Sequence, residues 1–184
     1  MEFIKRDPVI FLIAGKANSG KDTSAEFIDN YVKLKGLKVV NLQLSSYIKM
    51  YAKKISGWNG EEDSKPRSLL QTLGTDIIRN KIDNYLFINR IIEDIKVYSY
   101  YFDVITISDG RMPEELDMIK NAFDKVYRLR VERPSFKSSL NKDELKHKTE
   151  TALDNYTNYE YTIINDGSLE DLNNKVKQII DEVI

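Results

Sequence analysis

Apolar runs alternate with amphipathic stretches along the chain, and this alternation predicts an α/β fold. Residues 9–14 are apolar at every position, which is typical of a strand buried on both faces of a parallel sheet. Shorter β-branched runs bounded by polar or turn residues predict four more strands, at 37–44, 102–110, 125–131 and 161–164. Strands that alternate with helices favour one parallel sheet with helices packed against it.

Between the predicted strands, apolar residues recur at the intervals of a helix face. We expect helices in the segments with this spacing, 25–34, 45–55, 67–79, 83–98 and 168–183. Ser168 is a typical N-cap for the last of them, and Pro113 followed by acidic residues predicts another helix start. We see no internal repeat and no linker, so we expect residues 1–184 to form a single domain.

The first strand leads into the pattern G-x-x-x-x-G-K, which is typical of a loop that cradles phosphate groups. The glycines permit backbone conformations that turn successive N–H groups toward phosphate oxygens, and Lys21 adds a mobile positive charge. A preceding strand and a following helix are the context that this pattern requires. The alternative is a glycine-rich turn with a solvated lysine. We expect a nucleotide-phosphate site at Gly15, Asn18, Ser19, Gly20, Lys21, Asp22 and Thr23.

One carboxylate, Asp109, is a candidate Mg²⁺ ligand, whereas Asp22 is a departure from the usual phosphate-loop pattern. Asp22 stands where such loops usually have the Ser or Thr that holds the ion, and Thr23 follows one place late. Asp109 ends the strand predicted at 102–110, and a strand-terminal Asp beside a phosphate-binding loop suits a hard cation, usually through water. The alternative for Asp109 is a turn-forming Asp-Gly pair.

Composition narrows the choice of partner. The chain has 184 residues, 41% of them hydrophobic, and a net charge of −1, so no global basic field draws it to a nucleic acid polymer or an anionic membrane. We therefore favour a small anion as the partner. There is no cysteine, which excludes disulfides, thiolate metal sites and thiol nucleophiles. The N-terminal residues lack the apolar core of a signal peptide, and we expect a cytoplasmic protein.

Polar side chains near the strand ends are candidates for a second, acceptor phosphate. Ser46 and Lys49 follow the second predicted strand, at the edge where ligands bind in open α/β sheets; a solvated helix face is the alternative. Arg67 and Arg79 flank an apolar helix face and could clamp an anion or form surface ion pairs. Arg111 lies between a strand end and a helix start, and we favour it for the acceptor phosphate.

Two polar stretches are candidate covers for the site. Residues 133–150 are dense in charge and bounded by predicted strands, which is typical of a lid. We interpret His147, within this stretch, as a hydrogen-bonding residue rather than a base, because phosphoryl transfer needs little base strength. In the loop 57–66, Trp58 could stack on a base or pin the loop to the core. The cations available to close over a transferring phosphate are Arg128, Arg130, Arg133 and Lys137.

Five motifs resemble, in order, those of the deoxynucleoside monophosphate kinases of bacteriophages and their bacterial relatives. They are found at 15–23, 70–79, 109–115, 147–150 and 164–169. The sequence Lys21-Asp22-Thr23 is shared by that group and the animal-type phosphomevalonate kinases. The resemblance spans nearly the whole chain, and it makes Asp22 part of a family pattern rather than a defect.

The resemblance implies a P-loop kinase fold of the nucleoside monophosphate kinase type. This fold is a three-layer α/β/α sandwich around a five-stranded parallel sheet, with an acceptor-binding region about 45–100 and a lid about 133–150. The implied reaction is transfer of the γ-phosphoryl group from ATP, with Mg²⁺, to a (deoxy)nucleoside monophosphate. A kinase of phosphomevalonate or dephospho-coenzyme A, and a nucleotide-binding switch without transfer, are the alternatives.

The same resemblance implies roles for single residues. Asn165 and Gly167 would lie at the adenine of the donor, and Thr23 at its α-phosphate. Asp22 and Asp109 would hold the metal ion. The residues acting in transfer would be Lys21, Asp109, Arg111 and Arg133. The acceptor would contact Ser46, Lys49, Arg67, Arg79, Arg111, Glu114 and Glu150.

Overall fold

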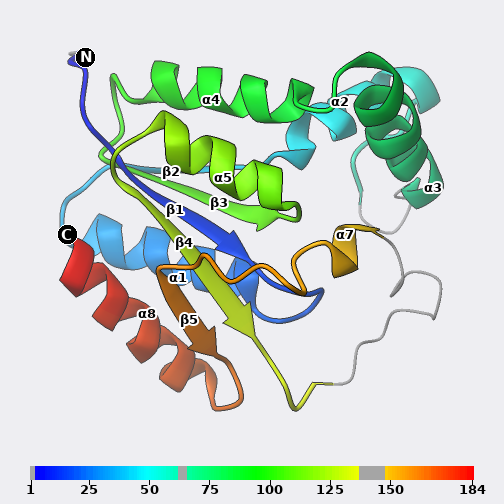
Figure 1. Cartoon of the computed structure of the whole chain (residues 1–184). Helices are drawn as coiled ribbons and strands as arrows, with labels where there is room; N and C mark the ends of the chain where they lie inside the picture. The colour runs from blue at the N-terminus through cyan, green and yellow to red at the C-terminus, as the bar shows by residue number, and fades with distance from the viewer. Residues whose placement is uncertain (1–2, 62–65, 137–147) are drawn as a thin grey trace.

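A five-stranded parallel sheet forms the centre of the protein (Figure 1). The computed structural model describes residues 3–61, 66–136 and 148–184. The strand order is β2-β3-β1-β4-β5, and every neighbouring pair is parallel, as the sequence predicts. The strands are β1 (Val9–Ala14), β2 (Val39–Leu42), β3 (Val104–Gly110), β4 (Val126–Glu132) and β5 (Tyr161–Ile164).

The central strand β1 packs its side chains alternately on two helical layers. Ile10, Leu12 and Ala14 belong to one hydrophobic cluster, whereas Phe11 and Ile13 belong to the other. Because both faces of β1 are covered, its uniformly apolar sequence is what this position requires. The loop that follows Ala14 therefore leaves the middle of the sheet at its carboxyl edge.

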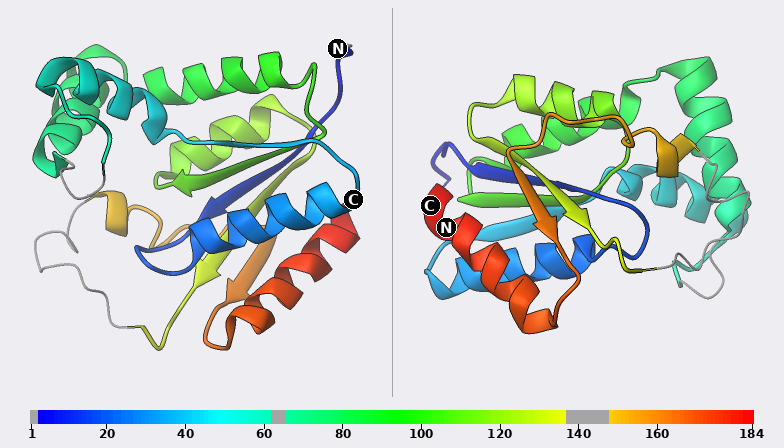
Figure 2. Two further views of the ribbon diagram at one scale, coloured as in Figure 1. Left: turned by 180° about the vertical axis from the view of Figure 1, so that it is seen from behind. Right: turned by 60° about the horizontal axis from the view of Figure 1, so that its bottom comes forward.

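Helices cover both faces of the sheet, which confirms the three-layer arrangement (Figure 2). On one face lie α1 (Lys21–Leu34) and α8 (Leu169–Val183), and on the other lie α4 (Leu86–Tyr98) and α5 (Pro113–Ala122). Ser168 caps α8 as predicted, because its hydroxyl accepts a hydrogen bond from the backbone N–H of Asp171 over 3.1 Å. None of the helices among the described residues has the length and apolarity that a membrane crossing needs.

A helical subdomain lies beyond the carboxyl end of β2 (Figure 1). It consists of α2 (Ser45–Ser56), α3 (Arg67–Gln71) and η1 (Thr72–Ile82). Trp58 is buried in its small core, and the indole N–H donates to the carbonyl of Glu61 over 2.8 Å. Of the two interpretations of Trp58, the structure favours the one in which it pins the loop.

The segment predicted as a single α-helix at 67–79 changes its hydrogen-bond pattern after one turn. From Thr72 to Ile82 the backbone forms a π-helix, and the N–H of Asp83 bonds the carbonyl of Ile78, five residues earlier, over 2.9 Å. Apolar spacing does not separate the two helix types, since both place residues three to five apart on one side. The π-helix is rare and occurs mostly as single-turn bulges, which are frequent at functional sites.

The predicted lid at 133–150 is described only in part. Its last residues belong to the short helix α7 (Lys148–Thr151), whereas Lys137 and His147 lie outside the described residues. Two of the cations predicted to close over phosphate lie on β4 and have other partners. Arg128 pairs with Glu160 and Asp117, and Arg130 donates to the carbonyl of Leu153 over 3.0 Å.

Candidate active site

The loop between β1 and α1 depends on two glycines. Gly15 and Gly20 have φ angles of 153° and 104°, which residues with a Cβ atom rarely adopt. There is also no room for a side chain at either position. A Cβ atom on Gly15 would lie 2.3 Å from the carbonyl oxygen of Val131, and one on Gly20 would lie 2.4 Å from Nδ2 of Asn165. The loop thus fits tightly against the chain at the ends of β4 and β5.

Asn165 supports this loop from the end of β5. Its Nδ2 donates to the carbonyl of Ser19 over 2.8 Å, and its backbone N–H donates to the carbonyl of Glu132 over 2.7 Å. The residue is buried, and its side-chain amide is already hydrogen-bonded to the loop backbone. Contact of Asn165 with adenine stays a prediction, as does that of Gly167, which is exposed in the turn before α8.

The hydroxyl of Ser19 is a buried polar group that lacks a partner. The residue is 3% exposed, and its Oγ makes no hydrogen bond within the part of the chain that the structure describes. Buried hydroxyls are normally satisfied. Because Ser19 also lines a pocket beside the loop, its hydroxyl fits a ligand oxygen.

Lys21, the first residue of α1, is almost fully buried. Its Nζ donates to the carbonyl of Lys16 over 2.8 Å, which bends the side chain back over the loop. Burial, together with the nearby charge of Arg111, lowers the pKa of Lys21 from 10.5 to about 8, while Asp22 and Glu150 act in the opposite direction. A phosphate group bound here would supply the negative charge that this ammonium group lacks.

The two candidate metal ligands have different surroundings. Asp22 is exposed, and its Oδ1 accepts a hydrogen bond from the hydroxyl of Ser108 over 2.9 Å. Both oxygens of Asp109 accept backbone N–H groups, from Leu44 and Ser45, each over 2.9 Å. Asp109 therefore also anchors the start of α2 to the end of β3, by satisfying N–H groups that have no partner within the helix.

The donor chemistry of these carboxylates fits Mg²⁺. A carboxylate oxygen can accept more than one contact, so the hydrogen bonds to Asp22 and Asp109 leave room for a cation or its water. The described part of the chain contains no group of three or more His, Cys, Asp or Glu residues that could hold a metal ion alone. Mg²⁺ usually combines one or two carboxylates with water and substrate phosphates.

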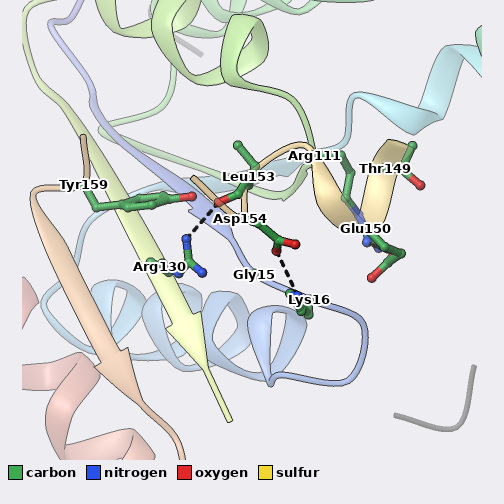
Figure 3. Close-up of a pocket in the computed structure, with 9 residues that line it drawn as sticks. All are labelled: Gly15, Lys16, Arg111, Arg130, Thr149, Glu150, Leu153, Asp154 and Tyr159. Atoms are coloured by element: carbon green, nitrogen blue, oxygen red, sulfur yellow. Dashed lines mark hydrogen bonds and ion pairs between the residues drawn. The ribbon is translucent and has the colours of Figure 1, made fainter. Parts of the chain in front are cut away.

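Glu150 connects the phosphate-binding loop to Arg111. Figure 3 shows its side chain beside that of Arg111. Its Oε2 accepts a hydrogen bond from the backbone N–H of Ala17 over 3.1 Å, and its Oε1 pairs with the guanidinium group of Arg111. Loop amides and arginine forks are the groups that bind phosphate oxygens. A single carboxylate thus already occupies contacts that an anionic ligand would make.

Arg79 and Glu115 form a second, more buried ion pair. Nη2 of Arg79 lies 2.7 Å from Oε1 of Glu115, and the exposed fractions of the two side chains are 14% and 3%. Sequence reasoning named the neighbouring Glu114 instead, which is exposed. The pair joins η1 to the start of α5, close in the chain to Arg111. Arg79 therefore forms an ion pair, as one of its two interpretations held, but a largely buried one; its contact with an anion stays a prediction.

The pocket beside the loop that Ser19 lines has a volume of about 240 Å³, and Arg133 and Phe136 are also among its lining residues. The guanidinium carbon of Arg133 lies 5.0 Å from the ring centroid of Phe136. Flat cationic and aromatic groups are suited to contact the face of a nucleotide base. This placement gives Arg133 a base-contacting alternative to its predicted role in transfer.

The remaining predicted site residues lie in more open positions. Nζ of Lys49 bonds Oε1 of Gln43 over 3.0 Å, at the start of the helical subdomain. Thr23 is half-buried in the first turn of α1. The predicted residues that are exposed are Asn18, Ser46 and Arg67. The structure leaves their contacts with a ligand as predictions.

Comparison with known proteins gives the chain's relatives. Residues 33–176 match the family model described as deoxynucleotide monophosphate kinase. The deoxynucleotide monophosphate kinase of Enterobacteria phage T4 is 31% identical over 123 residues, covering 66% of this chain and 48% of the phage protein. A relative from Acanthamoeba polyphaga mimivirus is 26% identical over 125 residues, covering 63% of this chain and 61% of that protein. The matched region thus spans half to three fifths of these relatives.

Solved structures share the fold at low sequence identity. An APS kinase of Mycobacterium tuberculosis, in complex with AMPPNP and APS, superposes with a TM-score of 0.56 and 12% identity, covering 96% of this chain and 97% of that one. A sugar kinase of a Janibacter species gives a TM-score of 0.60 and 14% identity, with 95% of both chains covered. These likenesses establish the fold class that the sequence predicts.

Proposed function

The chain belongs to the deoxynucleotide monophosphate kinase family, and on that premise we propose that it transfers the γ-phosphoryl group of ATP to the 5′-phosphate of a deoxynucleoside monophosphate. The products would be ADP and the corresponding diphosphate. The acceptor-binding region about 45–100, the lid about 133–150 and the cytoplasmic location stay predictions.

The observation that carries this proposal is the position of the Glu150 carboxylate. It contacts the amide of Ala17 in the donor loop and the guanidinium group of Arg111, the arginine favoured for the acceptor. An anion at this point touches both halves of the candidate site. A phosphoryl group passing between two nucleotides needs such a point, because catalysis of its transfer is mainly positioning and charge stabilisation.

On the donor side, the loop, Lys21 and the pocket beside them support the binding of ATP. The loop from Gly15 to Gly20 would hold the phosphates, and the Ser19 hydroxyl could donate to one of their oxygens. The pocket between the loop and Arg133 would take the base. Mg²⁺, held by Asp22 and through water by Asp109, would neutralise part of the charge on the transferred group.

The transfer step needs cations more than a base. A phosphate monoester has a second pKa of about 6, so an acceptor phosphate is already ionised at neutral pH. Lys21 on the donor side and Arg111 on the acceptor side can stabilise the charge that spreads over the transferred group. Arg79, Lys49 and Ser46 would hold the rest of the acceptor.

A screen of acceptors tests the proposal. ADP release from ATP and Mg²⁺ is measured with each of the four common deoxynucleoside monophosphates, the four ribonucleoside monophosphates, phosphomevalonate and dephospho-coenzyme A. We expect at least one deoxynucleoside monophosphate to raise the rate above that with ATP alone. Stimulation only by phosphomevalonate or dephospho-coenzyme A would show that the acceptor is that compound and not a nucleoside monophosphate. ATP binding with no stimulation by any compound would favour a nucleotide-binding switch.

A further inference from the structure

We propose that Glu115 is a positioning residue that fixes two acceptor arginines, Arg79 and Arg111, in one geometry. This inference rests on the proposed function, since it concerns how the same site holds its acceptor. Neither the sequence motif nor the family relationship assigned this residue a role.

Each oxygen of Glu115 serves a different arginine. Oε1 accepts the hydrogen bond from Nη2 of Arg79 over 2.7 Å. Oε2 accepts the backbone N–H groups of Arg111 over 2.7 Å and of Met112 over 3.0 Å. One carboxylate therefore links η1, the turn after β3 and the first turn of α5.

These contacts leave the arginine side chains able to bind a ligand. Glu115 holds Arg111 through its main chain, so the guanidinium group of that residue is available to an anion, as its pairing with Glu150 shows. Arg79 has five N–H donors, of which Glu115 takes one, while another lies 3.4 Å from the carbonyl of Gly74. A guanidinium group oriented by one carboxylate can still present its other donors to phosphate.

The burial of Glu115 is better explained by a role in orienting the arginines than by a gain in the stability of the fold. A buried ion pair gains little over well-packed apolar side chains, because both charges lose their water. Burial raises the pKa of Glu115, and Arg79 and the backbone N–H groups of Arg111 and Met112 oppose this shift. Every hydrogen bond described for its carboxylate is an accepted one, which is what an ionised carboxylate provides.

An exposed acid outside the candidate site, Glu26, supplies a matched control for the test. Glu115→Gln keeps the shape of the side chain but removes its charge and replaces one acceptor oxygen with a donor. Glu26→Gln makes the same change on an exposed side chain of α1, to which no ligand contact is assigned. We expect Glu115→Gln to raise the KM for the deoxynucleoside monophosphate about tenfold or more and the KM for ATP less than about threefold. Glu26→Gln should leave both KM values unchanged.

Equal effects of the two variants, or an equal loss of ATP and acceptor affinity in Glu115→Gln, would overturn the inference. A double-mutant cycle with Arg79→Met tests the route of the effect. If Glu115 acts through Arg79, its substitution should change the acceptor KM much less when Arg79 is already absent. Full additivity would contradict that route. Should Glu115→Gln fail to fold, Glu115→Asp, which keeps the charge and shortens the reach, must raise the acceptor KM in its place.

Binding measurements separate this inference from the proposed function. If the wild-type protein transfers phosphate to none of the acceptors, the proposed function fails. Titration calorimetry with each deoxynucleoside monophosphate then asks whether Glu115→Gln binds more weakly than Glu26→Gln. Weaker binding supports Glu115 as a positioning residue without transfer. Equal binding, or no binding by wild type, overturns it.

Discussion

The donor half and the acceptor half of the candidate site are held in place by different means. The donor half, the loop 15–23 with Asn165, is a continuous stretch whose shape comes from glycine conformations and one side-chain contact to its backbone. The acceptor half, Arg79, Arg111 and Glu115, joins separate helices and turns through charged hydrogen bonds. A backbone site is fixed when the sheet forms, whereas a site built from ion pairs depends on each partner. We therefore expect changes to the two halves to affect ATP and acceptor separately.

The largest effect is expected from the donor lysine. Lys21→Met removes the positive charge beside the loop, and we expect kcat to fall at least ~10³-fold, because this charge stabilises the transferred group. Circular dichroism should show an unchanged fold. Turnover within a few fold of wild type would show that the loop does not serve the donor.

The same lysine should lower the stability of the ligand-free protein. Because burial lowers its pKa from 10.5 to about 8, the unfolded chain binds a proton between these pH values that the folded chain does not. Its contribution to the free energy of unfolding should therefore rise with pH across this window, by up to ~3 kcal/mol. Urea unfolding at pH 7 and pH 10 should show Lys21→Met to be the more stable protein at pH 7, by a margin that shrinks at pH 10. A margin independent of pH would contradict the burial of a charged ammonium group.

Asn165→Ala sharpens the comparison by removing the side-chain support of the donor loop. The carbonyl of Ser19 would lose a buried hydrogen bond, and we expect a loss of ~1–2 kcal/mol in the free energy of unfolding. The KM for ATP should rise more than the KM for the acceptor. Asn174→Ala, on the exposed side of α8, is the matched control and should change neither. A rise in the acceptor KM alone would show that Asn165 does not belong to the donor half.

Glu150→Gln tests the contact between the halves and has the smallest expected effect. The carboxylate competes with an incoming phosphate for Ala17 and Arg111, so removing its charge should tighten ATP binding to the free protein by about threefold to tenfold. Titration calorimetry of wild type and variant measures this change. If instead the acceptor KM rises while ATP binding is unchanged, Glu150 contacts the acceptor directly, as the family resemblance implies.

The donor half could be predicted from the sequence because its parts are contiguous. Gly15, Gly20 and Lys21 follow an apolar strand at fixed spacing, and the structure places them at the carboxyl end of β1. The strand order could not be read in this way, but the parallel sheet and its two helical layers followed from the alternation of apolar runs.

The acceptor half was harder to predict because its contacts span 36 residues, from Arg79 to Glu115. Two adjacent acids in one helix turn looked equivalent, and only the orientation of α5 buries the second. A local signal existed: Glu115 is three residues after Met112, the N-cap of α5, a spacing at which a Glu side chain returns to the N-cap N–H. The same residue shares its helix face with the buried Ile119. The π-helix of η1 had no comparable signal.

Transfer of label is the most direct test of the account as a whole. Wild-type protein is incubated with Mg²⁺, ATP labelled in its γ-phosphate and each deoxynucleoside monophosphate, and the products are separated. The account predicts label in a deoxynucleoside diphosphate, and none when Lys21→Met replaces the wild type. Label released only as inorganic phosphate, or retained in ATP with every acceptor, would contradict phosphoryl transfer between the two halves of the site.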